Sequence, residues 1–442
     1  MAGSRQSLTS IDAVAIIVGI VVGAGIFRSP SIVAASAGSS ASFLLLWPLG
    51  GAISLIGALC YAELASAYPD EGGDFHYFTL AFGKGVAFLF AWARLMVIQT
   101  GSIVILAFVF GDYSAQLLPI GRHASAIYAA GAIVLLTIMN ALSVRGSTTT
   151  QDLLSAAKLL GLTFVFLVGL FFAPPASNAV LSPAPVAPFG LALVFVLLTY
   201  GGWNEIAFAS AELRNVKRDM LRALVWGILI ITVIFFLINL AYLHGLGLQG
   251  IRDSEVVAAD LMRKALGEPG AKFISFLIAV TTLGAISGTI FTGARTNYAL
   301  GRSFAPLRFM GGWSARTNSP LGALLAQGVI SLVLVLLGAW QRRGFETLVG
   351  YTAPVFWLFF FLAGVSLLVL RRKQPDTPRP FRVPLYPLTP ILFCATCAYM
   401  LWSSLAYTGL GAFAGVIVLL AGGVVLLIHT ALGKTKREET GI

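Results

Sequence analysis

The sequence predicts an all-α integral membrane protein with twelve transmembrane helices, of which the first and the sixth are broken at mid-membrane. Three observations support this fold class. Of the 442 residues, 58% are hydrophobic and 11% are charged, whereas a soluble domain carries about 25% charged residues. The apolar residues are grouped in segments of about 20, which is the length of a helix that crosses a bilayer. Glycines interrupt two of these segments near their centres.

Twelve apolar segments follow one another along the chain, separated by polar loops. They are residues 11–37, 42–67, 85–110, 127–144, 153–172, 189–211, 221–242, 273–300, 321–340, 345–370, 388–407 and 411–432. No loop is long enough to form a separate domain, so residues 1–442 are predicted to form a single transmembrane domain.

Charge predicts the orientation of these helices. An even number of spans places both termini on one side, and most of the 29 lysine and arginine residues lie at the termini and in the loops of that side. The positive-inside rule therefore predicts that both termini are cytoplasmic. The net charge of +11 is accounted for by these loops, and no nucleic acid partner is expected.

The first span contains the sequence Gly23-Ala24-Gly25 near its centre. Each glycine costs a helix about 1 kcal/mol relative to alanine. Hydrocarbon cannot satisfy the backbone groups that a break exposes, so a broken helix at this depth lines a cavity or meets a ligand. The N–H groups of residues 23–26 would then begin a second half-helix, whose positive end attracts an anion such as a carboxylate. Gly19 and Gly23 also form a small-xxx-small pattern, which would instead favour close packing of an unbroken helix.

The sixth span repeats this interruption with the pair Gly201-Gly202, five spans after the first. Glycine-interrupted spans in corresponding halves of a chain are typical of inverted-repeat transporters with a binding site at the membrane midplane. We therefore predict a first repeat at about residues 11–172, a second repeat at about 189–370, and two accessory helices within about 388–432.

Three charged residues lie inside or beside the predicted spans. A charge at the centre of a span costs at least about 2.5 kcal/mol, so it faces a cavity or a partner. Lys158 in the fifth span either does this or extends to the cytoplasmic interface. Glu205 follows the second break and could bind a cation, whether a substrate, a proton or a protein residue. Arg94 in the third span is open to similar interpretations.

Cysteine and histidine give no sign of a metal, cofactor or catalytic site. Cys60, Cys394 and Cys397 all lie within apolar segments, where cysteine acts as a packing residue. The Cys394-xx-Cys397 pair has no second cysteine pair or nearby histidine to complete a metal site. No metalloprotease, Ser-His-Asp or phosphate-loop motif is present, so an enzyme is not expected. A channel would need a continuous polar lining, for which the spans offer too few polar residues in register.

Short motifs occur in a specific order along nearly the whole chain. They are Val-Gly-Ala-Gly-Ile-Phe at 22–27, Tyr-Ala-Glu-Leu at 61–64, Tyr-Pro-Asp-Glu-Gly-Gly at 68–73, and residues 140–145, 151–159, 200–204, 212–218 and 371–384. Their order and spacing resemble those of the amino acid–polyamine–organocation (APC) superfamily, particularly its L-amino-acid transporter (LAT)-like branch.

This resemblance implies a LeuT-type fold, with a five-plus-five inverted repeat and two additional C-terminal helices. It implies a sodium-independent transporter of small, neutral L-amino acids that works by alternating access, through exchange or proton coupling. The substrate carboxylate would bind the amides at residues 23–26, and the amino group would bind the carbonyls of Val21 and Leu198. Lys158 matches a lysine that lies where sodium-coupled relatives hold the ion. The expected substrate-binding residues are Val21, Gly23, Ala24, Gly25, Ile26, Leu198, Gly201, Gly202, Asn204, Glu205 and Ser287.

The chain also departs from the family pattern. Leu198 stands where several exchangers have an aromatic gate, which leaves the size of the pocket open. Glu205 is unusual, so a cationic amino acid or polyamine transporter of the same fold is the alternative. Residues 111–123 contain no cysteine, whereas animal members linked to a heavy chain have one between the third and fourth spans. No disulfide-linked partner is therefore expected, and the short termini are typical of a bacterial inner-membrane protein.

Overall fold

The computed structural model describes residues 8–70, 72–142, 148–176, 188–341 and 343–440. These residues are helical throughout, apart from loops and two isolated backbone bridges, Leu8 to Leu213 and Ser314 to Ser319. In chain order the elements are α1 (Ser10–Val21), α2 (Gly25–Ser36), α3 (Ser40–Ala67), α4 (Asp74–Phe82), α5 (Lys84–Ala93), the π-helical η1 (Arg94–Gln99), α6 (Thr100–Leu117), α7 (Ala124–Ala141), α8 (Thr148–Phe171), α9 (Phe189–Thr199), the 3₁₀-helical η2 (Trp203–Glu212), α10 (Val216–Asp253), α11 (Val257–Ser303), η3 (Ala305–Met310), α12 (Leu321–Gln341), α13 (Gly344–Lys373), α14 (Leu388–Tyr407) and α15 (Leu410–Thr440).

The membrane spans agree with the predicted twelve segments. Within the described ranges, eleven helical stretches are long and apolar enough to cross a membrane, and the bent pair α1–α2 forms a twelfth span. Large apolar side chains such as Leu160, Leu336 and Leu427 remain exposed on the outside of the bundle. Such a surface is stable in lipid, which solvates apolar side chains. The prediction of an all-α integral membrane protein is confirmed.

Several loops contain more helix than the sequence suggests. Most of the polar stretch at 252–272 belongs to α11, which begins at Val257 and buries Val257, Leu261 and Met262 against the bundle. This stretch is short and rich in charged residues, so hydropathy alone does not distinguish it from a loop. Gly267 adopts a positive φ of 73° and kinks α11 between its first, loop segment and the eighth span. Likewise, α4 lies in the predicted loop before the third span, and η1 interrupts that span with a π-helical segment.

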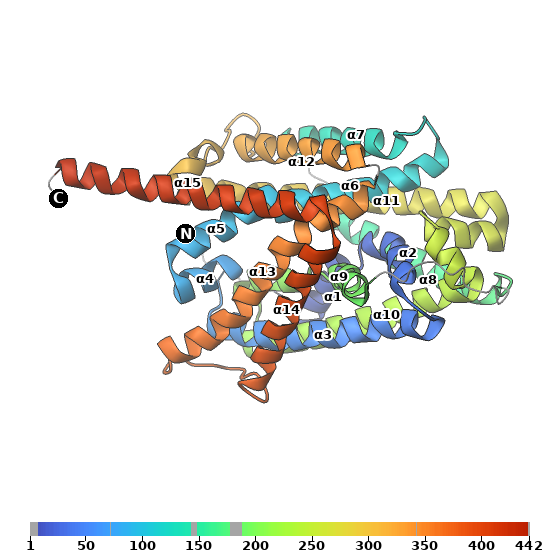
Figure 1. Ribbon diagram of the computed structural model, residues 1–442, viewed down its shortest axis with the longest axis horizontal. Helices are drawn as coiled ribbons and strands as arrows, with labels where there is room; N and C mark the ends of the chain where they lie inside the picture. The colour runs from blue at the N-terminus through green and yellow to red at the C-terminus, as the bar shows by residue number, and fades with distance from the viewer. Residues whose placement is uncertain (1–7, 71, 143–147, 177–187, 342, 441–442) are drawn as a thin grey trace.

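The broken spans lie in the middle of the bundle. Figure 1 shows α1, α2 and α9 between the α3–α10 pair and the layer that contains α6 and α11. α7 and α12 cover the far side of α6, while α13 crosses the molecule and packs against both α14 and α15. This arrangement places both helix breaks away from lipid, where exposed backbone groups can be satisfied.

Contacts between distant segments show which ends of the spans share a face. Leu8 pairs with the backbone of residues 212 and 214, which ties the start of the first span to the end of the sixth. At the ends of the second and tenth spans, the buried Glu63 accepts hydrogen bonds from Arg371 at 2.7 and 2.6 Å. The N-terminus and the even-numbered loops therefore lie on one face, which we call the N-terminal face. Whether this face is cytoplasmic, and whether the chain divides into two repeats at the proposed boundaries, stay predictions.

Candidate functional site

The first span is broken at the predicted glycines. α1 ends at Val21 and α2 begins at Gly25, with a 56° bend between them. The Gly23 N–H donates to the Val21 carbonyl at 2.6 Å. No side chain caps α2, and the N–H groups of Ala24, Gly25 and Ile26 have no backbone acceptor among the described residues. The start of α2 is thus an uncapped helix N-terminus inside the bundle, and the alternative of an unbroken first helix is wrong.

The sixth span is broken at its glycine pair. α9 ends at Thr199, and the chain continues after Gly202 as the 3₁₀ helix η2. Gly202 has a φ of 107°, a left-handed conformation that glycine adopts without a steric penalty. The Gly201 N–H donates to the Leu198 carbonyl at 3.0 Å. The Val21 carbonyl accepts one turn hydrogen bond, and because a carbonyl oxygen has two lone pairs, it retains acceptor capacity. The Leu198 carbonyl accepts from the backbone N–H groups of Gly201 and Tyr200.

The tertiary structure brings the two breaks together. A Cβ atom added to Gly25 would lie 3.3 Å from Cγ2 of Thr199, and one added to Gly202 would lie 2.7 Å from Cγ2 of Ile20. The Thr199 hydroxyl donates to the hydroxyl of Ser29 in α2 at 2.8 Å. Each break therefore packs against the other span through a glycine. Backbone donors at 24–26 and backbone acceptors at Val21 and Leu198 belong to one central unit, which we call the paired breaks.

Lys158 reaches the paired breaks from α8. Its Nζ atom donates to the carbonyl of Gly19 at 3.1 Å, near the end of α1. The side chain is half-buried and points into the bundle, which argues against its extending to the membrane interface. The ammonium group therefore lies at the C-terminal end of a half-helix, where the helix dipole favours a positive charge.

Glu205 and Arg94 form an ion pair beside the second break. The two Nη atoms of Arg94 donate to the two carboxylate oxygens of Glu205 at 3.2 and 3.0 Å. The Arg94 side chain is 8% exposed and lies over the ring of Phe208, 4.7 Å from its centroid. The sequence leaves open whether Glu205 binds a cationic substrate, a proton or a protein residue. In the structure its partner is a protein residue, Arg94. The pair ties η2 to η1 in the third span, and Asn204 is buried next to it.

Asp74 is a buried carboxyl group that the sequence analysis does not single out. It begins α4, in the segment between the second and third spans, and lies near Arg94, Glu205, Tyr61 and Asn204. Burial and the nearby Glu205 raise the pKa of Asp74, whereas Tyr61, Arg94 and Asn204 oppose this rise, and the pKa reaches about 7. The sequence around Asp74 resembles an ordinary polar loop, so only the packing of α4 reveals the burial.

Arg28 forms a second ion pair, on the face opposite the N-terminal face. Its Nη2 donates to Glu346 of α13 at 2.8 Å, and its Nη1 donates to the Glu255 carbonyl at 3.0 Å. Arg28 lies in α2, directly after the first break. A buried arginine pair therefore holds a half-helix on each side of the paired breaks, Arg28 holding α2 and Arg94 holding η2. The sequence gives no signal for either pairing, because the partners are far apart along the chain.

Ser287 contacts a different part of the bundle. Its hydroxyl accepts a hydrogen bond from the Asn140 amide of α7 at 3.4 Å. No contact found within the described ranges joins Ser287 to either break. Its proposed place near the substrate side chain stays a prediction.

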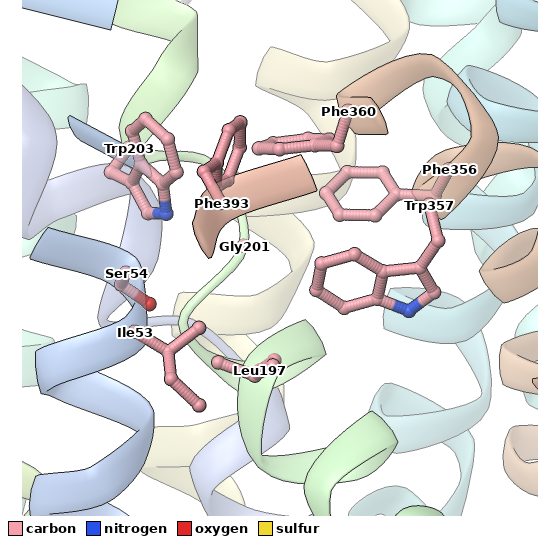
Figure 2. A pocket seen from close by; sticks show the side chains of 9 residues that line it. All are labelled: Ile53, Ser54, Leu197, Gly201, Trp203, Phe356, Trp357, Phe360 and Phe393. Atoms are coloured by element: carbon pink, nitrogen blue, oxygen red, sulfur yellow. The ribbon is translucent and has the colours of Figure 1, made fainter. Parts of the chain in front are cut away.

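A small cavity borders the second break. Its volume is about 20 Å³, enough for about one water molecule. Figure 2 shows that the lining is mostly aromatic and comes from α3, α9, η2, α13 and α14 as well as from Gly201 in the break. The lining residues are Ile53, Ser54, Leu197, Gly201, Trp203, Phe356, Trp357, Phe360 and Phe393. The cavity is too small for an amino acid.

Comparison with known proteins agrees with this architecture. Residues 8–426 match the family described as amino acid permease. The chain is 31% identical over 392 residues to b(0,+)-type amino acid transporter 1 of Mus musculus, covering 86% of this chain and 79% of that protein. It is also 31% identical over 422 residues to large neutral amino acids transporter small subunit 2 of Mus musculus, covering 92% and 78% respectively. The match extends over both breaks and nearly every span. The chain therefore belongs to the amino acid permease family, in the APC superfamily with LAT-type relatives.

Proposed function

We propose that this amino acid transporter carries small, neutral L-amino acids independently of sodium, by alternating access. The observation that supports this most strongly is the pairing of the two breaks. Free N–H groups at 24–26 suit the substrate carboxylate, and the carbonyls of Val21 and Leu198 suit its ammonium group. The name of one relative refers to large neutral amino acids, which agrees with a neutral substrate. We further propose that Gly23, Gly201, Gly202, Asn204, Glu205 and Ser287 complete the substrate site.

Lys158 supports the proposal of sodium independence. Its ammonium group already donates a hydrogen bond to the Gly19 carbonyl of α1, next to the break. A fixed charge there would repel a sodium ion in the same place. Transport would then proceed by exchange of one amino acid for another or by coupling to a proton, with Lys158 as the coupling or structural cation.

A cationic amino acid or a polyamine is the alternative substrate. The sequence favoured it through Glu205, but the bidentate pair with Arg94 already balances that carboxylate. A cationic substrate would have to compete with a guanidinium group that is held in place by two hydrogen bonds. This contact makes the neutral substrate the better proposal.

Transport by purified protein in proteoliposomes tests both substrates. We expect labelled alanine to exchange at the same rate in sodium and in choline buffer. Unlabelled neutral L-amino acids should compete with it, and lysine and putrescine should not. A panel of all twenty amino acids, with the internal substrate and the pH varied separately, identifies the preferred side chain and the coupling. Strong competition by lysine or putrescine would support the alternative, and dependence on sodium would contradict the role of Lys158.

We also infer that the N-terminal face is cytoplasmic, in a bacterial inner membrane, and that the protein is a carrier with no enzymatic activity. We propose that it works without a disulfide-linked partner, because Cys60, Cys394 and Cys397 are all buried.

The orientation in the membrane can be tested by single substitutions to cysteine at Arg382 and Arg122, which are exposed on the two opposite faces. In intact cells an impermeant maleimide should label the Arg122→Cys variant and spare the Arg382→Cys variant. The reverse pattern would invert the topology.

A further inference from the structure

A largely buried polar cluster lies beside η2 and shares Glu205 with the proposed substrate site. It combines Asp74 of α4, Arg94 of η1 and Glu205 of η2 with the tyrosines Tyr61 of α3 and Tyr77 of α4. The whole Asp74 residue is 5% exposed, and the side chains of Arg94 and Glu205 are 8% and 35% exposed. The cluster therefore joins four elements at the end of the sixth span, and we call it the Asp74 cluster.

The charges of the Asp74 cluster do not balance. It contains two carboxyl groups and one guanidinium group, and both Nη atoms of Arg94 are used by Glu205. The Oδ1 atom of Asp74 has no hydrogen-bond partner in the described part of the chain, and neither have the hydroxyls of Tyr61 and Tyr77. A buried carboxylate beside a cation that is already paired is costly, and protonation removes that cost.

The surroundings of Asp74 favour a neutral carboxyl group. The titratable groups that interact with Asp74 are Tyr61, Tyr77, Arg94 and Glu205. Behind them, Asp70 of the preceding loop interacts with Tyr77, and Cys397 of α14 interacts with Tyr61. Arg94 is the single cation among these groups, and it is already paired. Burial and Glu205 both raise the pKa of Asp74, which reaches about 7.

We propose that Asp74 is a proton-binding site that controls how tightly η2 is held on the N-terminal face. When Asp74 is neutral, Arg94 is bound by Glu205 alone and η2 stays attached to η1. When Asp74 is ionised, it competes for the guanidinium group and loosens η2. The proton enters from the N-terminal face and returns to it, so the site changes the rate of transport and does not drive accumulation. This inference rests on the proposed function, because η2 is the second half of a broken span.

The test varies pH on one side of oriented proteoliposomes and measures alanine exchange. The ionised fraction of a single carboxyl group rises about tenfold from one pH unit below its pKa to one unit above. We therefore expect exchange to accelerate by up to about tenfold as the pH at the N-terminal face rises through about 7. Asp74→Asn, an isosteric neutral variant, should keep the low-pH rate at every pH.

Asp70→Asn is the matched control. Asp70 lies in the same loop with its side chain 45% exposed, and the amide oxygen can still accept the hydrogen bond from the Gly72 N–H. This variant should keep the pH profile of the wild type. An Asp74→Asn variant with the wild-type profile would overturn the proton site while leaving amino acid transport intact. Absence of any exchange by the wild type would instead contradict the proposed function.

A spectroscopic measurement does not depend on transport. Infrared difference spectra of the wild-type protein in detergent, between about pH 6 and pH 8, should show the loss of a protonated-carboxyl band with a midpoint near pH 7. The component with this midpoint should be missing from Asp74→Asn and present in Asp70→Asn. Its absence from the wild type would overturn the proposal, whatever the folding of the variant.

Discussion

At the scale of single residues, glycine matters where another span comes close. Gly25 and Gly202 lie at the paired breaks, and each faces a side chain of the other broken span, Thr199 and Ile20 respectively. Gly202 also requires a left-handed backbone. A side chain at either position would separate the two breaks, and with them the N–H groups and the carbonyls that we propose to bind one substrate.

Replacing Gly25 with valine should abolish transport without preventing membrane insertion. A Cβ atom would already lie 3.3 Å from Thr199, and the branched methyl groups would block the approach of a carboxylate to the backbone. Because a displacement of about 1 Å can cost about 100-fold in rate, we expect a loss of at least that size in alanine exchange. Gly131→Val is the control, because nothing lies within 4 Å of a Cβ atom at Gly131. Normal exchange by the Gly25 variant would contradict the assigned carboxylate site.

Replacing Lys158 with alanine should reduce turnover at every pH. The substitution removes the ammonium group from the carbonyl of Gly19, so the C-terminal end of α1 loses its fixed cation. Exchange of labelled alanine measures the effect, which we expect to be a marked loss of rate. Lys84→Ala serves as the control because Lys84 is exposed. If the Lys158 variant keeps wild-type rates across the pH range, the coupling role is wrong.

At the scale of elements, two ion pairs hold the half-helices that follow the breaks. Arg28 connects α2 to α13 on one face, and Arg94 connects η2 to η1 near the other. Both pairs are present in this conformation, and the cavity next to the second break has a volume of only about 20 Å³. A substrate that enters from one face requires the half-helices on that face to move, so we infer that opening each face weakens its own pair.

The pair between Arg28 and Glu346 provides a test at this scale. Removing one partner of a fully buried pair costs about 3–5 kcal/mol, because the other charge is left uncompensated. The cost is smaller here, since the Glu346 side chain is 25% exposed. Arg28→Met should therefore lower the free energy of unfolding more than the double variant Arg28→Met/Glu346→Met does. Thermal unfolding in detergent, arranged as a double-mutant cycle, measures the coupling. Additive effects of the two substitutions would show that the pair contributes nothing to holding α2.

At the scale of the whole molecule, contacts between distant helix ends fasten the N-terminal face. The bridge between Leu8 and Leu213, and the contact between Glu63 and Arg371, each join spans that are far apart in sequence. The first contact holds together the ends of the two broken spans, and the second joins the unbroken helices α3 and α13. Together they keep the broken helices in place. The buried Asp74 is part of this face, and we expect it to make the stability of the fold depend on pH.

The stability of the folded protein should decrease as pH rises toward neutrality. Asp74 has a pKa of about 7 in the fold, above the ordinary value of 3.8, so the folded state binds this proton more tightly than the unfolded state. The stabilising effect is complete below the ordinary pKa and is lost as pH rises through about 7. Thermal unfolding in detergent between about pH 5 and pH 8 should show this decline, and Asp74→Asn should reduce it. An equal slope in the variant would assign the pH dependence to other groups.

The sequence by itself determined the features that depend on local composition. Hydropathy defines the twelve spans because lipid imposes a length and an apolar surface on every helix that crosses it. Both breaks could be predicted, since glycine at mid-span weakens a helix wherever it packs. Lys158 stands out for a similar reason, because a charge inside an apolar segment needs a partner.

Only the tertiary structure decided which of these residues meet. Glu205 binds Arg94, Asp74 is buried, Ser287 contacts Asn140, and the two breaks pack against one another. No local pattern encodes such pairings, because each depends on the packing of helices that are far apart along the chain. The π-helical η1 and the buried start of α11 escaped prediction for the same reason, since contacts with neighbouring helices determine their form. The free energy of these contacts comes from burial and pairing across the bundle, and it exists only once the helices have assembled.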